Sequence, residues 1–196
     1  MARKTEGAKS AVHGAFLCAV MEWEDKVKEK AARGREILFG KDNPMTAELA
    51  CAAEKASRAA CAFWALDAAE RCAGLVTCGA GEAAEAVRLS RLWAEGKIKM
   101  PLAKAAILAC HGAAKRCGDR FDRAVLHAVG QGCSTVHSKK HAVGLPMYLL
   151  TAVYVRYGAE ETEKTFAALK QSLSEYSERR FETGVAAFLS EKERKS

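Results

Sequence analysis

The sequence predicts an all-α protein, a single compact bundle of six or seven helices. Alanine, the best helix former, is abundant, whereas proline occurs only three times in 196 residues. Hydrophobic residues make up 49% of the chain and recur at helical spacing, so they can line a sizeable core. The chain has no alternating run rich in Val, Ile, Thr and Tyr and no Asn-Gly turn, the two patterns that would predict β-hairpins.

Capping residues and helix breakers place the helices along the chain. The predicted ranges are 8–38, 44–78, 82–95, 101–118, 119–137, 141–157 and 159–192. The first helix ends near Gly40, and the second begins after Asn43, a good capping residue, with Pro44 in its first position. Gly79 and Gly81 break the chain before the third helix because glycine weakens a helix.

The later helices have local signals as well. Gly96 follows the third helix, at a position that favours a left-handed residue, and Pro101 begins the fourth. Asp119 caps the fifth helix, and Asp122 lies in its first turn, where the helix dipole favours a carboxylate. Gly158 separates the sixth helix from the last.

The segment between the fifth and sixth helices contains two histidines four residues apart. The turn at 138–140 is so short that the two helices must pack antiparallel. We expect His137 to end the fifth helix and His141 to lie in the first turn of the sixth. Each should bond across the contact to Gln131, Thr135, Tyr148 or a backbone carbonyl. Pro146 predicts a late start or a mild kink in the sixth helix, because proline lacks an amide donor.

No linker or repeat divides the chain, so we expect one helical domain over residues 1–196. It would consist of an N-terminal helical addition (1–54), a core (55–157) and a C-terminal helix (158–196). No run of about 18 apolar residues predicts a membrane span. Eight cysteines without a CxxC pair indicate a reduced, cytoplasmic protein.

The net charge of +7 is concentrated in one segment. Residues 97–141 hold two acidic residues, Asp119 and Asp122, and nine basic residues: Lys97, Lys99, Lys104, Lys115, Arg116, Arg120, Arg123, Lys139 and Lys140. Such a basic field attracts acidic partners. A solvated face, an acidic protein partner and a nucleic acid all fit this charge, although the chain has no RNP, KH or zinc-finger pattern.

The histidines also allow a metal or a catalytic interpretation. Two histidines at i and i+4 on one helix form a good zinc pair, with His127 or Cys133 as a third ligand. This pair straddles a turn, however, and no carboxylate lies between residues 123 and 159 to orient a ligand. Catalysis would pair a nucleophile such as Cys133 or Ser134 with His137 as the base. We interpret the histidines as structural and predict no metal, cofactor or enzymatic activity, with an enzyme or metalloprotein as the alternative.

Four stretches carry a family resemblance. They are residues 60–72, 85–100, 105–115 and 128–154, with the motif residues Trp64, Asp67, Glu70, Arg71, Trp93, Gly96, Ile98, Gly130, Gln131, Thr135, His137, His141, Gly144 and Tyr148. In this order they resemble the fifth type of immunity protein, a family found beside bacterial polymorphic toxins. The similarity covers about residues 55–157.

The resemblance implies a non-enzymatic, cytoplasmic inhibitor that binds a cognate toxin domain and needs no cofactor. The nine basic residues would then contribute to the surface that meets an acidic toxin face. We expect Trp64 and Trp93 to be at least partly buried. We also expect Asp67, Glu70 or Arg71 to pair with a polar residue of the fifth or sixth helix, because charges on an apolar helix need partners. A helical nucleic-acid-binding protein and a homodimer remain open alternatives.

Overall fold

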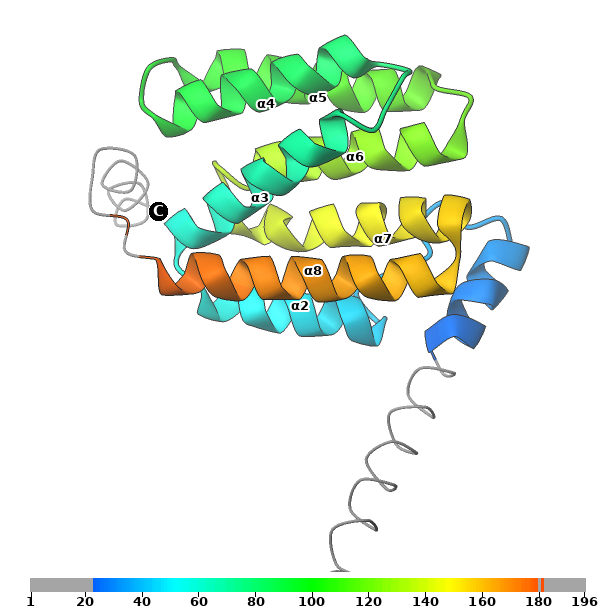
Figure 1. The fold of residues 1–196 in the computed structure, drawn as a ribbon. Coiled ribbons are helices and arrows are strands. Elements are labelled where there is room, and N and C mark those ends of the chain that lie inside the picture. Colours follow the sequence, from blue (N-terminus) through cyan, green and yellow to red (C-terminus); the bar gives the residue numbers. More distant parts are fainter. Residues whose placement is uncertain (1–22, 180, 182–196) are drawn as a thin grey trace, which may run out of the picture. The chain divides into compact units, whose positions relative to one another are not determined.

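The structure is a computed structural model that describes residues 23–179 and 181. Its regular elements are α2 (Pro44–Lys55), α3 (Arg58–Ala73), α4 (Ala80–Ala94), α5 (Met100–Arg116), α6 (Arg120–Ser134), the 3-10 helix η1 (Lys139–Val143), α7 (Gly144–Tyr157) and α8 (Ala159–Glu178) (Figure 1). Residues 23–32 are also helical. The all-α prediction is confirmed, and the described residues contain no strand. The predicted number of helices is too low, because this part of the chain holds eight numbered helices besides residues 23–32.

The described residues fall into two compact units that divide between Leu38 and Phe39. In the first unit, the helix ends at residue 32 rather than near 38, and residues 8–22 of its predicted range lie outside the described part. Gly34 adopts a left-handed conformation with φ of 66°, and the amide of Arg35 donates to the carbonyl of Lys30 at 3.0 Å. This glycine-based cap ends the helix.

In the second unit, the predicted helix 44–78 is two helices. α2 begins as predicted, with the side chain of Asn43 accepting from the amide of Met45 at 3.0 Å. Ala56 and Ser57 are extended, and the hydroxyl of Ser57 accepts from the amide of Ala60 at 3.1 Å, which caps α3. Ser57 therefore marks the start of a new helix, although the apolar periodicity continues across it and predicted a single helix.

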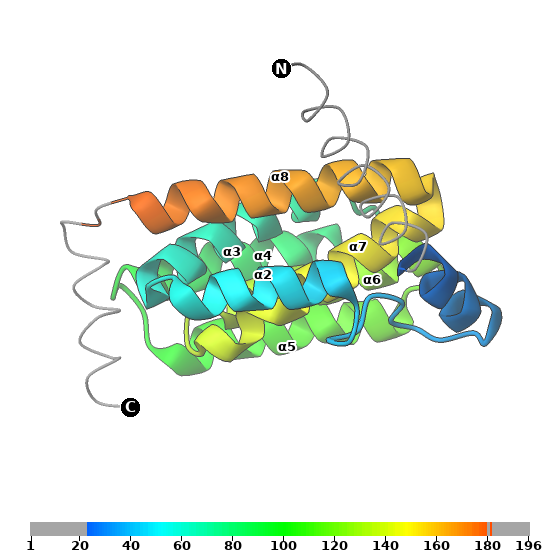
Figure 2. The ribbon, with the colours of Figure 1, turned by 90° about the horizontal axis from the view of Figure 1, so that it is seen from below.

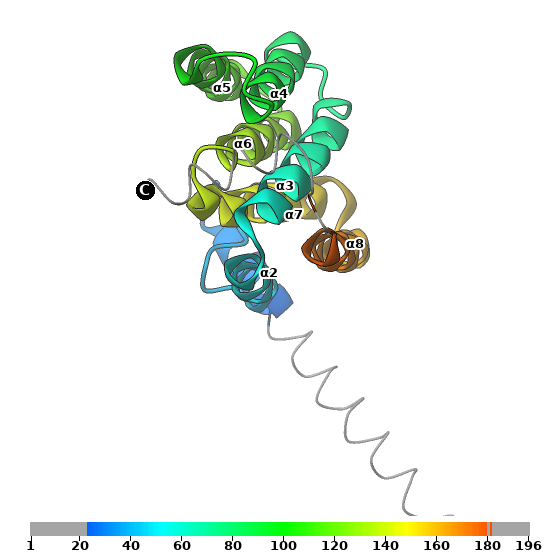
Figure 3. The same cartoon turned by 90° about the vertical axis from the view of Figure 1, so that its left-hand side faces the viewer.

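The central element of this unit is α6, which packs against α3, α4, α5 and α7. Figure 3 looks nearly along the helices and shows α6 between the α4–α5 pair and α3 with α7. Eleven of its fifteen residues are buried, so almost every side of the helix faces another helix. α8 packs on α7 and α3 and contacts α2, and Figure 2 shows α2 and α8 lengthwise.

The connection between α6 and α7 differs from the prediction. The two helices do pack against each other, as the short turn required. However, α6 ends at Ser134, and residues 139–143 form η1 before α7 begins at Gly144. Pro146 is thus in the first turn of α7, where its missing amide donor costs no hydrogen bond. The predicted late helix start is confirmed, and Pro146 is its physical reason.

The remaining predicted helices are close to the observed ones. α4 and α5 begin and end within one or two residues of their predicted bounds. Gly96 has a φ of 73°, and the amide of Lys97 donates to the carbonyl of Leu92 at 2.8 Å, which is the predicted glycine cap. α8 ends at Glu178, before an extended Arg179, and residues 182–192 of its predicted range lie outside the described part. No helix in the described ranges is both long and apolar enough to cross a membrane.

Candidate functional site

The tryptophans of the first two motifs are buried, as predicted. Trp64 on α3 is 0% exposed, and Trp93 on α4 is 4% exposed. The indole nitrogen of Trp64 donates to the carbonyl of Leu169 at 3.2 Å and to the hydroxyl of Ser172 at 3.0 Å. Because both acceptors lie on α8, this motif residue fixes α8 against α3.

The charged residues of the first motif have partners other than those predicted. Arg91 on α4 contacts Asp67 and Glu70 on α3, each with an N–O distance of 2.6 Å. The hydroxyl of Tyr176 on α8 donates to the second oxygen of Asp67. Burial opposes ionisation of Asp67, but the hydrogen bonds from Tyr176 and Arg91 outweigh it and lower its pKa. The predicted pairing with the fifth or sixth helix is therefore wrong, because α4 and α8 flank this face of α3. Arg71 is exposed.

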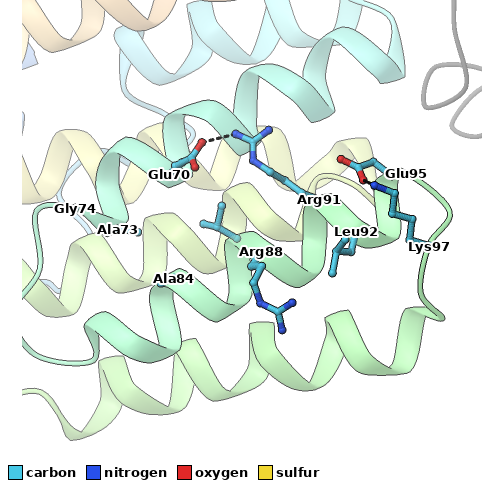
Figure 4. A pocket seen from close by; sticks show the side chains of 10 residues that line it. Glu70, Ala73, Gly74, Ala84, Arg88, Arg91, Leu92, Glu95 and Lys97 are labelled. Carbon is cyan, nitrogen blue, oxygen red and sulfur yellow. Dashed lines mark hydrogen bonds and ion pairs between the residues drawn. The ribbon is translucent and has the colours of Figure 1, made fainter.

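A groove of about 620 Å³ lies next to this network, between α3 and α4 (Figure 4). Its lining combines apolar residues with the charged residues Glu70, Arg88, Arg91, Glu95 and Lys97. Arg91 pairs with Glu70, Lys97 pairs with Glu95, and Arg88 pairs with Glu85. Each cation of the lining therefore has a carboxylate within ion-pair distance, so none of these three is left unpaired to select an anionic ligand.

Histidines from three elements lie on one side of the second unit. The Nδ1 atoms of His111 on α5 and His127 on α6 are 2.9 Å apart, which is hydrogen-bond distance. The ring of Tyr148 on α7 lies 4.9 Å from the ring of His127, centroid to centroid. One imidazole must donate and the other accept, so the two rings cannot both carry a proton at Nδ1.

Glycines permit the close approach of these helices. A Cβ atom on Gly130 would lie 2.5 Å from the ring of His111, and one on Gly144 would lie 2.5 Å from the side chain of Gln131. The side-chain oxygen of Gln131 is 3.0 Å from Nδ1 of His141. The predicted bond between His141 and Gln131 is thus confirmed, although His141 lies in η1 and not in the first turn of α7.

His137 has a different place from the predicted one. It follows the end of α6, and its side chain is exposed. Its ring packs 5.1 Å from that of His141, and its backbone carbonyl accepts from Arg58 at 3.1 Å. Within residues 23–179 the ring makes no hydrogen bond across the helix contact, because α6 stops before it reaches this residue. We name His111, His127, Gln131, His137, His141 and Tyr148 the histidine face.

Burial lowers the pKa of three imidazoles of the histidine face, those of His111, His137 and His141. Burial, together with the charges of His127, His141 and Lys115, lowers the pKa of His111 to about 4. Burial and the neighbouring His141 lower the pKa of His137, and burial lowers that of His141. Proton binding at His111 therefore works against the folded state.

We expect the free energy of unfolding to fall as the pH falls from about 6.5 to 4. In this window an unfolded histidine, with a pKa near 6.5, binds more protons than folded His111, so acid favours unfolding. Allowing for the partial exposure of the ring, the loss is about 2 kcal/mol. Urea unfolding at both ends of the window measures it. His111→Gln should be less sensitive to pH than the wild type, and an unchanged pH dependence in this variant would contradict the assignment.

The metal and catalytic interpretations of the histidines have little support among the described residues. Within them, no group of three or more His, Cys, Asp or Glu side chains could hold a metal ion. Cys133 is fully buried, and burial raises the pKa of its thiol to about 12. A protonated, buried thiol is a poor nucleophile, so the pairing of Cys133 with His137 does not supply the elements of a catalytic dyad. The groove between α3 and α4 and one of about 430 Å³ between α3, α7 and α8 contain no histidine.

Arg58 is a buried residue that the sequence analysis missed. It is 7% exposed, and its guanidinium donates to the carbonyls of Val136 and His137 at 3.2 and 3.1 Å. These carbonyls lie just past the end of α6, so Arg58 satisfies acceptors that the helix leaves open. No local signal predicted these bonds, because the acceptors lie 78 and 79 residues away in the sequence.

The nine basic residues do not form one uniform patch. Some have structural partners: Arg116 pairs with Glu82 at 3.1 Å, and Lys97 pairs with Glu95 at 2.6 Å. Arg123 donates to the carbonyl of Cys117 at 3.2 and 2.9 Å, and Lys139 donates to the carbonyl of Glu54 at 2.8 Å. Arg120 is half-buried. The exposed lysines without such a structural role are Lys99, Lys104, Lys115 and Lys140.

A family model described as "Imm-5 like putative immunity protein" matches residues 52–179, more than half of the chain. The chain belongs to this family. The match is longer than the resemblance at 55–157, because it also includes α8. The contacts of Trp64 and Asp67 with α8 give a structural reason for including that helix in the Imm-5 like core. No curated protein and no solved structure is significantly similar to the chain.

Proposed function

We propose that this Imm-5 like chain is a non-enzymatic immunity protein that neutralises a cognate toxin domain by binding it. The observation that carries the proposal is the family match over residues 52–179. We further propose that the protein acts in the cytoplasm, where it would meet a toxin before that toxin damages the producing cell. No cofactor is required for inhibition by binding.

The geometry of the polar networks supports a binding role over a reaction. Trp64, Asp67 and Arg91 connect α3 with α4 and α8, and His111, His127 and Gln131 connect α5, α6 and η1. Satisfied polar networks of this kind hold helices in one arrangement. A rigid scaffold limits the entropy lost on association, which favours tight binding of a protein partner.

The proposal predicts that a toxin is encoded beside the gene of this chain, and that the chain protects a bacterial host from it. Expression of that toxin domain alone should arrest growth, and co-expression of this chain should restore it. The two proteins should also elute together as a stoichiometric complex in size-exclusion chromatography. Growth arrest that persists despite abundant, folded immunity protein would contradict the proposal.

Nucleic-acid binding is the second candidate, and the basic segment is the observation that favours it. No acidic residue lies between Glu95 and Asp119, a stretch that includes all of α5. A nucleic-acid complex that depends on this charge would weaken steeply as the salt concentration rises, because each phosphate contact releases a counterion. Binding of this kind can be separated from toxin binding with variants of α5.

A further inference from the structure

The outer side of α5 is an unusual surface of this protein. α5 packs against α4 and α6, and Figure 3 shows it at the edge of the helix assembly formed by the second unit. On its other side, Leu102 is 56% exposed and Leu108 is 58% exposed. Of the four large hydrophobic residues that are exposed in the described part of the chain, these two are on this one helix.

The two leucines belong to a continuous apolar surface. Ala105 and Ala109 follow Leu102 by three and seven residues, so they lie on the same side of α5, and both are exposed. Leu108 follows Ala105 by three residues, so Ala105 lies between the two leucines on the surface of α5. A partner that covers this area would remove two leucine side chains from water, which is favourable in proportion to the apolar area buried.

Lysines border this apolar surface. Lys104 lies four residues before Leu108, and Lys115 lies seven residues after it, on the side of α5 that carries His111. The charge of Lys115 acts on His111 and that of Lys104 acts on His137, so both lysines lie next to the histidine face. We name Leu102, Lys104, Ala105, Leu108, Ala109 and Lys115 the α5 outer face.

We propose that the α5 outer face is the docking surface for the cognate toxin, and that it takes an acidic protein surface with an apolar centre. This inference rests on the proposed immunity function. The leucines contact the apolar centre, while Lys104 and Lys115 face carboxylates at its edge. Protein interfaces commonly combine an apolar core with a charged rim that guides the approach of the partner.

The chemistry of the face favours this occupant over two others. A nucleic acid would use the lysines, but α5 contains no Phe, Tyr or Trp on which bases could stack, and phosphates gain nothing from exposed leucines. A second copy of the chain would bring Lys104 and Lys115 near the same residues of its partner, and like charges at an interface repel. An acidic protein uses both the apolar and the charged part of the surface.

The first test measures binding of the purified, inactivated toxin domain encoded beside this gene. Leu102→Glu and Leu108→Glu place a carboxylate on the proposed apolar contact and should each raise the dissociation constant by about 30-fold or more. The matched control is Leu75→Glu, because Leu75 is similarly exposed, at 51%, and lies outside α5. This control should bind as the wild type does. Circular dichroism melts establish that all three variants are folded.

The second test concerns the charged rim. The double variant Lys104→Glu, Lys115→Glu should lower the association rate by about 10-fold and reduce its dependence on salt, because steering by charge is lost. The control is Lys41→Glu, an exposed lysine in the segment before α2. If the lysine variants and the control associate equally fast, the proposed charge complementarity is wrong.

The outcomes separate the docking surface from the immunity function. If the wild type binds the toxin domain and the leucine variants bind equally well, the α5 outer face is not the docking surface, while the proposed function stands. If the wild type does not bind the toxin domain, both the proposed function and the proposed docking surface are wrong. A homodimer that Leu108→Glu abolishes would assign the face to a second copy. Salt-sensitive binding of a short RNA that Lys104→Glu abolishes and Leu108→Glu preserves would assign it to a nucleic acid.

Discussion

Replacing Gly132 with alanine is expected to lower the free energy of unfolding by about 3 kcal/mol. A Cβ atom at this position would lie 2.9 Å from the backbone oxygen of Ala65 on α3 and 2.7 Å from Leu145 on α7. A backbone oxygen within a helix cannot move aside as a flexible side chain can, so α6 would have to shift away from α3. This steric effect outweighs the gain of about 1 kcal/mol that alanine brings within a helix.

Gly81→Ala is the matched control for Gly132→Ala. Gly81 lies in α4, and a Cβ atom there would meet nothing within 4 Å. Because alanine meets no steric obstacle at this position, only its higher helix propensity affects stability. This variant should therefore be about 0.5 kcal/mol more stable than the wild type. Urea or thermal unfolding measures both changes. Equal stabilities of the two alanine variants would show that the α3–α6 contact is looser than described.

Replacing Asp122 with alanine should also lower the free energy of unfolding by about 3 kcal/mol. Asp122 is 3% exposed, and its carboxylate accepts from the amide and hydroxyl of Thr77 at 3.2 and 2.9 Å and from the amide of Cys78 at 3.0 Å. Alanine would leave two amides of the α3–α4 connection without this acceptor. Urea unfolding near neutral pH measures the loss.

Thr77→Val provides the comparison for Asp122→Ala. It removes the hydroxyl donor and keeps both amide bonds, so it should cost about 1 kcal/mol. The contribution of the carboxylate also depends on pH. Burial raises the pKa of Asp122, but the amides of Cys78 and Thr77 and the hydroxyl of Thr77 outweigh it and lower the pKa. The stabilisation is therefore present above the pKa of an unfolded aspartate, near 3.9, and is lost as the pH falls through the folded value. An Asp122→Ala variant no less stable than Thr77→Val would contradict this account.

The role of Asp122 shows how sequence and structure differ in what they reveal. Its place in the first turn of a helix predicted only an interaction with the helix dipole. Asp119, three residues earlier, caps α6. Its carboxylate accepts from the amide of Asp122 at 2.8 Å, as the sequence predicted. The bonds of Asp122 to Thr77 and Cys78 connect residues more than forty positions apart. A contact of this kind has no local signal.

The histidines give a second example. The sequence placed Gln131 among the expected partners of His141, because the short turn forces α6 and α7 together. It did not indicate that His111 on α5 would pair with His127, since this pairing depends on how α5 crosses α6 near Gly130. It also placed His137 inside a helix, because the pattern gave no reason for α6 to stop at Ser134.

The sequence by itself determined the all-α class, most helix boundaries and the family. Alanine content, capping residues such as Asn43 and Asp119, and glycines such as Gly96 act within one or two turns of the chain, so they can be read without a fold. Only the tertiary structure decided the partners of Asp67, the α8 contacts of Trp64 and the exposure of Leu102 and Leu108. An apolar residue on a helix fits a core and a docking surface equally well. Which of the two it occupies depends on whether another helix covers it, and that is a property of the assembled fold.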